Sequence, residues 1–489
     1  GRALKEEDNT TAGAITYSYL SSNRVQVTNN RGYKTTSKLL AYGTPELKRL
    51  LTISSPHGVS TTLAYNVYGN VTSIRQGGVT ESRVYDSYQQ LCKTIRPDIG
   101  NVAFFKNALG KTEWSSRGSS INSSTNSCDY SVSSSDKTTV SYDNLGKVKR
   151  VSYGDGTPSK VYEYDKNERL TRLSFGNATQ NYTYDDLGNL LIERLRVDNI
   201  DWSFNYLYNS TGNLHRTTYP SGRKVDYHPN ALGQPRYVGA FANSVLFHPD
   251  GQYKSYKQSN GCVNSKSLRS SGLPYTQRTQ CGGTNVLYNQ YSYDANGNLT
   301  FWDDKQSSVY DLRFGYDQLD RLDNIRKSNS ALIGDMNYDS MGNITKFDSI
   351  VGTIHYSYNS KKQLQSTSGS RNYDFNYDHR GAVTDNGFHR FYYNLASQMT
   401  EAGGNQYVYD GHNKRVKAND SNGIRYSMYS MLNGKLVQEN INGANREYYY
   451  LNSQLVAQTG AGSLTYIHGD LLGTSAAKTN SAGSVTKRI

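Results

Sequence analysis

A short phrase recurs along almost the whole chain, and its spacing constrains the fold more than any other feature. The phrase starts with an aromatic residue, continues with Asp or Asn and a Gly, and ends with an aliphatic residue. The clearest copies carry these residues at Tyr142, Asp143 and Gly146; Tyr184, Asp185 and Gly188; Tyr293, Asp294 and Gly297; and Tyr338, Asp339 and Gly342. Weaker copies start at Tyr65, Tyr85, Phe105, Tyr164, Tyr208, Tyr227, Phe247, Tyr316, Tyr358, Tyr377, Tyr393, Tyr409, Tyr429, Tyr450 and Tyr466. About nineteen copies at intervals of roughly 20 residues indicate a repeat protein.

Each copy predicts one β-hairpin. Residues before the aromatic anchor alternate as in a strand, for example over Val161–Tyr164. The Asp side chain can accept backbone N–H groups two residues on, and the Gly supplies the positive φ that such a turn needs. Because the turn is short, neighbouring strands are expected to pair antiparallel.

The composition limits how these hairpins can assemble. Only 35% of the 489 residues are hydrophobic, and 43 residues are Tyr, so a thick aliphatic core is not expected. Disorder is excluded because aromatic residues make up 12% of the chain and recur at a fixed spacing. An open twisted sheet rarely exceeds about ten strands, and propeller blades need a repeat of about 40 residues. The sequence therefore predicts an all-β fold, a large hollow spiral β-sheet barrel of antiparallel hairpins.

Charge and hydropathy argue against a dedicated nucleic-acid site and against a membrane-spanning segment. The net charge of +13 comes from basic residues that are scattered, so no dedicated nucleic-acid site is expected. No apolar run is long enough to span a membrane. The first residues, Gly1–Asp8, contain no apolar signal region and no initiator methionine, so we expect a fragment of a longer polypeptide.

The four cysteines match no zinc-binding spacing. Cys262 and Cys281 flank one irregular segment and can form a disulfide in an oxidising compartment. Cys92 and Cys128 are left over, and buried free thiols are the expected state for most of the four.

The repeated phrase resembles the YD repeat of bacterial Rhs proteins, which also occurs in the C component of insecticidal Tc toxins and in teneurins. The segment Tyr409–Val416 resembles the start of the Rhs-associated core. The signature of that core falls on Tyr466, His468, Asp470 and Gly473. We therefore expect degenerate β repeats over residues 1–64, a YD-repeat shell over 65–408 and the core region over 409–489, ending before the family's autoprotease motif.

The resemblance implies a β-cocoon that encloses a C-terminal toxin domain. It further implies an N-terminal plug or a secretion-spike component, an immunity protein for the toxin, and export as a secreted effector by type VI secretion or within a Tc complex. Any toxin or aspartyl autoprotease activity would lie outside this chain. We expect no catalytic residue, cofactor or metal ligand here, and the four signature residues are expected to be structural.

Two other functions stay open at this stage. His468 and Asp470 lie two residues apart and could suggest metal or acid–base chemistry, but no third ligand is visible in the sequence. The hypothesis that the repeats themselves form an enzyme is therefore not supported by any set of catalytic residues in the sequence. The main alternative to a toxin shell is a cell-surface or wall-associated adhesion protein built from the same repeats.

Overall fold

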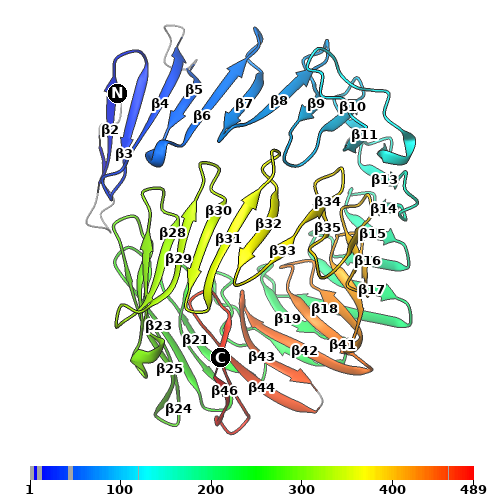
Figure 1. Ribbon diagram of the computed structural model, residues 1–489. Coiled ribbons are helices and arrows are strands. Elements are labelled where there is room, and N and C mark those ends of the chain that lie inside the picture. Colours follow the sequence, from blue (N-terminus) through cyan, green and yellow to red (C-terminus); the bar gives the residue numbers. More distant parts are fainter. Residues whose placement is uncertain (1–4, 8–13, 42–47, 119, 461, 489) are drawn as a thin grey trace. The chain divides into compact units, whose positions relative to one another are not determined.

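The computed structural model describes residues 5–7, 14–41, 48–118, 120–460 and 462–488 (Figure 1). Within these ranges the elements are β-strands and three short 3-10 helices, Pro56–Gly58, Ser134–Asp136 and Ser308–Tyr310. None of the described helices is long and apolar enough to cross a bilayer. The expectations for the N-terminal segment and for the C-terminal end of the core region include residues 1–4 and Ile489. These residues lie outside the described ones.

The strands of the described residues form four antiparallel sheets in which each strand pairs with its neighbour along the chain. The 20-stranded sheet contains β1 (Lys5–Glu7), β2 (Ala14–Leu20), β3 (Arg24–Thr28), β4 (Lys34–Ala41), β5 (Lys48–Ser54), β6 (Ser60–Tyr65), β7 (Val71–Gln76), β8 (Val79–Tyr85), β9 (Leu91–Ile95), β10 (Val102–Lys106), β11 (Thr112–Arg117), β12 (Lys137–Tyr142), β13 (Val148–Tyr153), β14 (Lys160–Tyr164), β15 (Leu170–Phe175), β16 (Ala178–Tyr184), β17 (Leu190–Val197), β18 (Ile200–Tyr208), β19 (Leu214–Thr218) and β20 (Lys224–Asp226). The 13-stranded sheet contains β21 (Ala242–Phe247), β22 (Tyr253–Gln258), β23 (Val263–Leu268), β24 (Pro274–Cys281), β25 (Thr284–Tyr293), β26 (Leu299–Asp304), β27 (Leu312–Tyr316), β28 (Leu322–Lys327), β29 (Leu332–Tyr338), β30 (Ile344–Ser349), β31 (Gly352–Tyr358), β32 (Leu364–Gly369) and β33 (Tyr373–Asp374). The short pair is β34 (Asn376–Tyr377) with β35 (Val383–Asp385). The 11-stranded sheet contains β36 (Phe391–Tyr393), β37 (Met399–Ala402), β38 (Asn405–Tyr409), β39 (Arg415–Asp420), β40 (Gly423–Tyr429), β41 (Leu436–Ile441), β42 (Ala444–Leu451), β43 (Gln454–Gly460), β44 (Ser463–Gly469), β45 (Ser475–Thr479) and β46 (Val485–Arg488).

The repeated phrase forms the turn of each hairpin. At Asp143, one carboxylate oxygen accepts the backbone N–H groups of Leu145 and Lys147 at 2.9 and 2.8 Å. The N–H of Gly146 donates to the Asp143 carbonyl at 3.0 Å, and Gly146 has a φ of +78°. The aspartate thus satisfies backbone donors that would otherwise be left unpaired in the turn, which is why a short acidic or amide side chain recurs here.

In nine of the repeats, the anchor tyrosine links its hairpin to the preceding one. Its hydroxyl donates a hydrogen bond of 2.6–2.9 Å to the carbonyl of an aliphatic residue at or near the start of a strand 13 to 17 residues earlier. The pairs are Tyr65 with Leu50, Tyr85 with Val71, Tyr164 with Val148, Tyr184 with Leu170, Tyr316 with Leu299, Tyr338 with Leu322, Tyr358 with Ile344, Tyr377 with Leu364 and Tyr450 with Leu436. Phenylalanine cannot make this bond, so the recurrence of tyrosine has a direct structural cause.

The chain folds as two compact units, each assembled from separate stretches of sequence. Unit 1 contains the chain up to Thr139, Tyr291–Asp303 and Ser307–Phe391. Unit 2 contains Val140–Gln290, Asp304–Gln306 and Tyr392–Ile489. The three-part division into residues 1–64, 65–408 and 409–489 stays a prediction.

Within each unit, an earlier row of hairpins stacks on a later row at a nearly regular distance along the chain. In unit 1, where Figure 1 shows β2–β9 and β28–β32 as two rows, Asn30 bonds the Ala295 carbonyl and Gln363 bonds the Asp98 carbonyl, both 265 residues apart. In unit 2 the corresponding separations range from 184 to 253 residues. Such a step is the signature of a spiral in which each row of hairpins lies on the previous one.

The buried core of the described residues lies mainly between the two rows of unit 2. It is rich in aromatic side chains, and Phe241 stacks on Tyr449 with ring centroids 3.8 Å apart. In unit 1 the described residues contain one small buried cluster, formed by Ala103, Ile121 and Val132. The predicted all-β fold of antiparallel hairpins wound as a spiral is confirmed, although aromatic residues give unit 2 a thicker core than the composition suggested.

The expectation of free thiols is wrong. Cys262 pairs with Cys281, and Cys92 pairs with Cys128 across a Cα–Cα distance of 5.5 Å. The second pair forms because the serine-rich segment after β11 folds back, with Ile121 and Val132 packed against Ala103 of β10. The sequence offered no periodic signal for this irregular segment, so the approach of Cys128 to β9 could not be anticipated.

The turn geometry predicts that Gly188→Ala lowers the free energy of unfolding by about 1–2 kcal/mol. A Cβ at Gly188 would meet no atom within 4 Å, so the cost comes from its φ of +87° alone. Lys362 holds the equivalent turn position with a φ of +64°, so Lys362→Gly is the matched control and should leave stability unchanged or raise it. Urea unfolding of the three proteins measures both effects. Equal loss in both variants would contradict the turn account.

Candidate functional site

The four residues of the core signature divide into a turn and a buried pair. Asp470 accepts the N–H groups of Leu472 and Thr474 at 2.9 and 2.8 Å, and Gly473 has a φ of +81°, so both belong to an ordinary repeat turn. Tyr466 and His468 lie on β44 and are buried. His468 has no exposed surface. The signature therefore combines a local turn with a histidine set into the contact between the two rows of unit 2.

The other predicted turn residues have the same local roles. Tyr142, Tyr184, Tyr293 and Tyr338 end strands β12, β16, β25 and β29. The carboxylates of Asp294 and Asp339 each accept two backbone N–H groups, as that of Asp143 does, and Asp185 accepts the N–H of Asn189. Gly188, Gly297 and Gly342 have φ values of +85° to +87°. Asp294 additionally lies 3.4 Å from Arg31 of the adjacent row in unit 1.

A buried chain of hydrogen bonds runs from β22 to His468, and its polarity is fixed at one end. Gln258 donates through Nε2 to the carbonyls of Val456 and Ile467 at 2.8 and 3.2 Å. Since a carbonyl can only accept, the Gln258 Oε1 atom is left to accept from Asn264 Nδ2 at 3.2 Å. This orients Asn264 so that its Oδ1 atom faces His468.

The same chain fixes the tautomer of His468. Asn264 Oδ1 accepts from Thr279 at 2.6 Å and lies 3.4 Å from His468 Nδ1, which therefore carries the proton. Thr479 accepts from Asn260 at 2.8 Å, so its own hydroxyl is available to donate to His468 Nε2, 2.8 Å away. Burial lowers the pKa of His468 to about 4, so the imidazole is neutral and Nε2 carries a lone pair.

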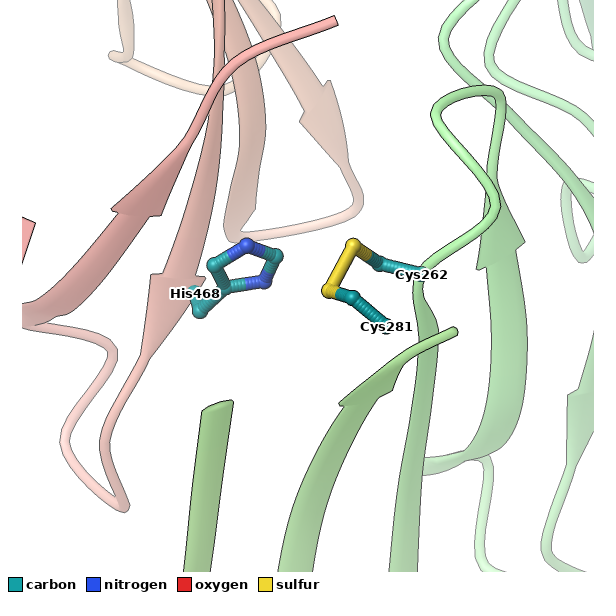
Figure 2. Close-up of side chains that lie close together, drawn as sticks. All are labelled: Cys262, Cys281 and His468. Atoms are coloured by element: carbon teal, nitrogen blue, oxygen red, sulfur yellow. A yellow bond between two sulfur atoms is a disulfide. The ribbon is translucent and has the colours of Figure 1, made fainter. Parts of the chain in front are cut away.

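The imidazole faces the disulfide between Cys262 and Cys281 (Figure 2). One ring nitrogen and the two sulfur atoms lie within 4.8 Å of one another. These partners of His468 could not be predicted from the sequence, because the cysteines precede it by roughly 200 residues and only the stacking of the two rows brings them together. While the disulfide is intact, the sulfur atoms have no thiolate to offer a metal ion.

A second buried polar contact joins the rows of unit 2. The Glu193 carboxylate on β17 accepts the Tyr206 hydroxyl and the N–H of Met431, the latter at 2.7 Å. Burial raises the pKa of Glu193 to about 7. Asp410 accepts from Gln180 at 2.9 Å, and burial raises its pKa to about 6. Both carboxyl groups are thus part of the contact between rows and hold their protons to higher pH than usual.

A cavity of about 310 Å³ lies in the same region of unit 2, lined by Tyr206, Tyr219, Tyr227 and Tyr450 among others. The Tyr219 hydroxyl donates to the Tyr448 carbonyl at 2.6 Å, and that of Tyr450 donates to the Leu436 carbonyl at 2.9 Å. The Tyr206 hydroxyl bonds Glu193 and Ser430. These three hydroxyls are engaged by the protein.

Comparison with known proteins gives one family match. Residues 119–259 match the teneurin YD-shell family. This segment covers most of the first row of unit 2, including β12–β20. No curated protein matches the chain in sequence.

Solved structures share the fold over nearly the whole chain. A crystal structure of TcdB2–TccC3 without its hypervariable C-terminal region matches with a TM-score of 0.69 at 11% identity, covering 100% of this chain and 29% of that one. The TcdB2–TccC3–Cdc42 structure matches with a TM-score of 0.69 at 12% identity, covering 97% and 30%. A mutant Tc holotoxin pore from Photorhabdus luminescens matches with a TM-score of 0.63 at 12% identity, covering 98% and 30%. The chain thus spans less than a third of the length of each of these three chains.

Removing Gln258, the first residue in the series of hydrogen bonds that leads to His468, should destabilise unit 2. Gln258→Leu leaves two carbonyls and the Asn264 amide without partners in a buried position, and we expect a loss of about 2–4 kcal/mol. Gln280→Leu on β24, two strands away in the same sheet, removes one exposed bond and should change stability by less than about 0.5 kcal/mol. Denaturant unfolding measures the free energy of unfolding of both variants. A similar decrease in both would show that the hydrogen bonds from Gln258 to His468 do not contribute more to stability than an exposed hydrogen bond.

The raised pKa of Glu193 predicts a pH effect of defined sign. The folded state holds the proton from the ordinary pKa of 4.5 up to about 7, whereas the unfolded chain releases it. This group therefore favours folding fully below about pH 4.5, and the contribution is lost as the pH rises to about 7. Glu193→Gln should remove a pH-dependent term on the order of 3 kcal/mol.

Denaturant midpoints recorded between pH 4.5 and 7.5 test this effect. Glu163→Gln, at an exposed position of unit 2, is the control and should keep the wild-type pH profile. An unchanged profile in Glu193→Gln would contradict the assignment of that proton to Glu193.

Proposed function

We propose that this chain, a YD-repeat protein of the Rhs/YD-repeat family, is the non-enzymatic shell of a secreted toxin and encloses a C-terminal toxin domain. The stacking of the hairpin rows within each unit carries the proposal. In such a wall of stacked hairpin rows, each strand pairs with its neighbour along the chain, and side chains connect each row to the next. It can extend around a cargo without a thick apolar core.

The sites described above support a structural role. Glu193, Asp410 and His468 are buried groups with shifted pKa values between the rows, and each is bound to partners within unit 2. Groups held in this way stabilise the wall and are not presented to a substrate. Toxin and autoprotease activities would belong to sequence outside this chain.

The similar structures suggest which domain the shell would enclose and which component would deliver it. One similar structure is named for a TcdB2–TccC3 complex lacking a hypervariable C-terminal region. By analogy, we propose that a variable toxin domain follows the repeats in the full polypeptide. An N-terminal plug or a spike component of a Tc or type VI system would close and carry the shell, and an immunity protein would protect the producing cell.

Two features fit export. Disulfides persist in oxidising compartments, and this chain forms two of them. The net charge of +13 would favour an acidic or unfolded cargo, although the charges are spread along the chain. The disulfides agree with a secreted effector, and the charge bears on the kind of cargo.

The test extends the chain into the downstream coding sequence and asks what happens to the added segment. We expect a cleaved C-terminal fragment that co-purifies with the repeats and resists added protease, whereas the same fragment expressed alone is degraded. A downstream segment that stays uncleaved and protease-sensitive would contradict the shell function. A wall anchor in its place would favour surface adhesion instead.

A further inference from the structure

We propose that Cys262, Cys281 and His468 form a zinc site once the disulfide between the two cysteines is reduced. Among the residues that the structure describes, this is the one group of three cysteine, histidine or acidic side chains whose ligand atoms come together closely enough to hold a metal ion. The proposal concerns a site of its own and does not depend on the shell function.

The geometry suits zinc. Two thiolates and one imidazole are a ligand set that Zn²⁺ accepts, with Zn–S distances of about 2.3 Å, Zn–N distances of about 2.0 Å and a fourth position left for an oxygen. The ligand atoms already lie within 4.8 Å of one another, and the two sulfur atoms move apart on reduction to reach that arrangement. Thr479 Oγ1, 4.0 Å from Cys262 Sγ and 2.8 Å from His468 Nε2, is placed to fill the fourth position or to bind a water there.

The surrounding hydrogen bonds prepare the histidine for this role. Its Nδ1 proton is directed to Asn264 Oδ1, and its Nε2 lone pair, which accepts from the Thr479 hydroxyl in the oxidised protein, can bind a metal ion once that hydroxyl turns away. A ligating histidine in proteins usually donates its other ring N–H to an oxygen acceptor, which fixes the ring orientation. Asn264 supplies that acceptor, and Gln258 holds Asn264 in place. Asn264 is therefore a positioning residue for the site.

The ligands stand on paired strands, which restricts how far they can separate. Cys281 ends β24, and Cys262 immediately precedes β23, where Val263 pairs with Gln280. His468 lies on β44 of the other row. Gly483 lies over the disulfide: a Cβ atom added at this glycine would lie 3.7 Å from Cys262 Sγ. Loss of the disulfide would therefore leave both sulfur atoms near the imidazole, and zinc would replace a link within one row by a link between two rows.

The chemistry balances with a named reductant. A dithiol supplies two electrons and two protons to the S–S bond, gives two protein thiols and becomes a disulfide itself. Zn²⁺ then displaces both thiol protons to solvent as it binds the sulfur atoms. In the oxidised protein the same three residues offer the imidazole alone, so the site is controlled by the redox state.

The experiment compares oxidised and reduced wild-type protein. A trialkylphosphine reduces the disulfides, taking the oxygen of one water molecule and delivering its two protons to the thiols for each bond cleaved. The reductant is then removed without air. We expect the reduced protein to bind one equivalent of Zn²⁺, with Co²⁺ as an optical probe giving thiolate charge-transfer bands, and the oxidised protein to show neither. Zinc should also raise the Tm of the reduced protein only.

The second disulfide provides a matched control. Cys92→Ser/Cys128→Ser should keep the zinc site after reduction, and Cys262→Ser/Cys281→Ser should lose it, with circular dichroism verifying the strand content of both. His468→Gln should weaken zinc binding by more than about tenfold. Absence of stoichiometric zinc in the reduced wild type, or thiolate bands that persist without Cys262 and Cys281, would overturn the proposal. The wild-type comparison decides the question even where a variant fails to fold.

Discussion

The hydrogen bond that nine of the anchor tyrosines donate to a carbonyl 13 to 17 residues earlier is the interaction on which the rest of the structure depends. It ties the end of one hairpin to the start of a strand in the hairpin before it, so the register passes from repeat to repeat. Asx turns of the kind seen at Asp143 set the length of each hairpin. Together they let a chain with few aliphatic residues build long sheets, because order comes from periodic polar contacts as well as from burial.

Stacking of the rows is a second level of organisation with different chemistry. In unit 1 the rows meet through exposed or half-buried contacts such as those of Arg31 with the Asp317 carbonyl and Asp320. In unit 2 they meet across an aromatic core that includes buried polar groups, namely Glu193, Asp410 and the chain from Gln258 to His468. A polar group in such a contact is stable only when all its partners are in place, so these groups favour one alignment of the rows over others.

The hairpins could be predicted from the sequence because their determinants are local. The aromatic, Asp and Gly of each phrase lie within a few residues, and period and turn chemistry follow from them. The stacked contacts could not be predicted, since Gln258 and Ile467 or Cys262 and His468 are brought together by rows about 200 residues apart. The pairing of Cys92 with Cys128 was missed for a related reason, because the intervening segment carries no repeat. The histidine of the core signature was recognised from sequence, but its tautomer and its two sulfur neighbours required the structure.

Zero-length carbodiimide cross-linking tests most directly whether the rows of hairpins stack as a spiral. Lys417 lies 2.7 Å from Asp198 on the other row of unit 2, and Lys147 lies 2.9 Å from Glu168 within one row. The account predicts that both amide links form in the folded protein and that mild denaturation abolishes the first before the second. A link between Lys147 and Glu168 without one between Lys417 and Asp198 would show that the hairpins form but the rows do not stack.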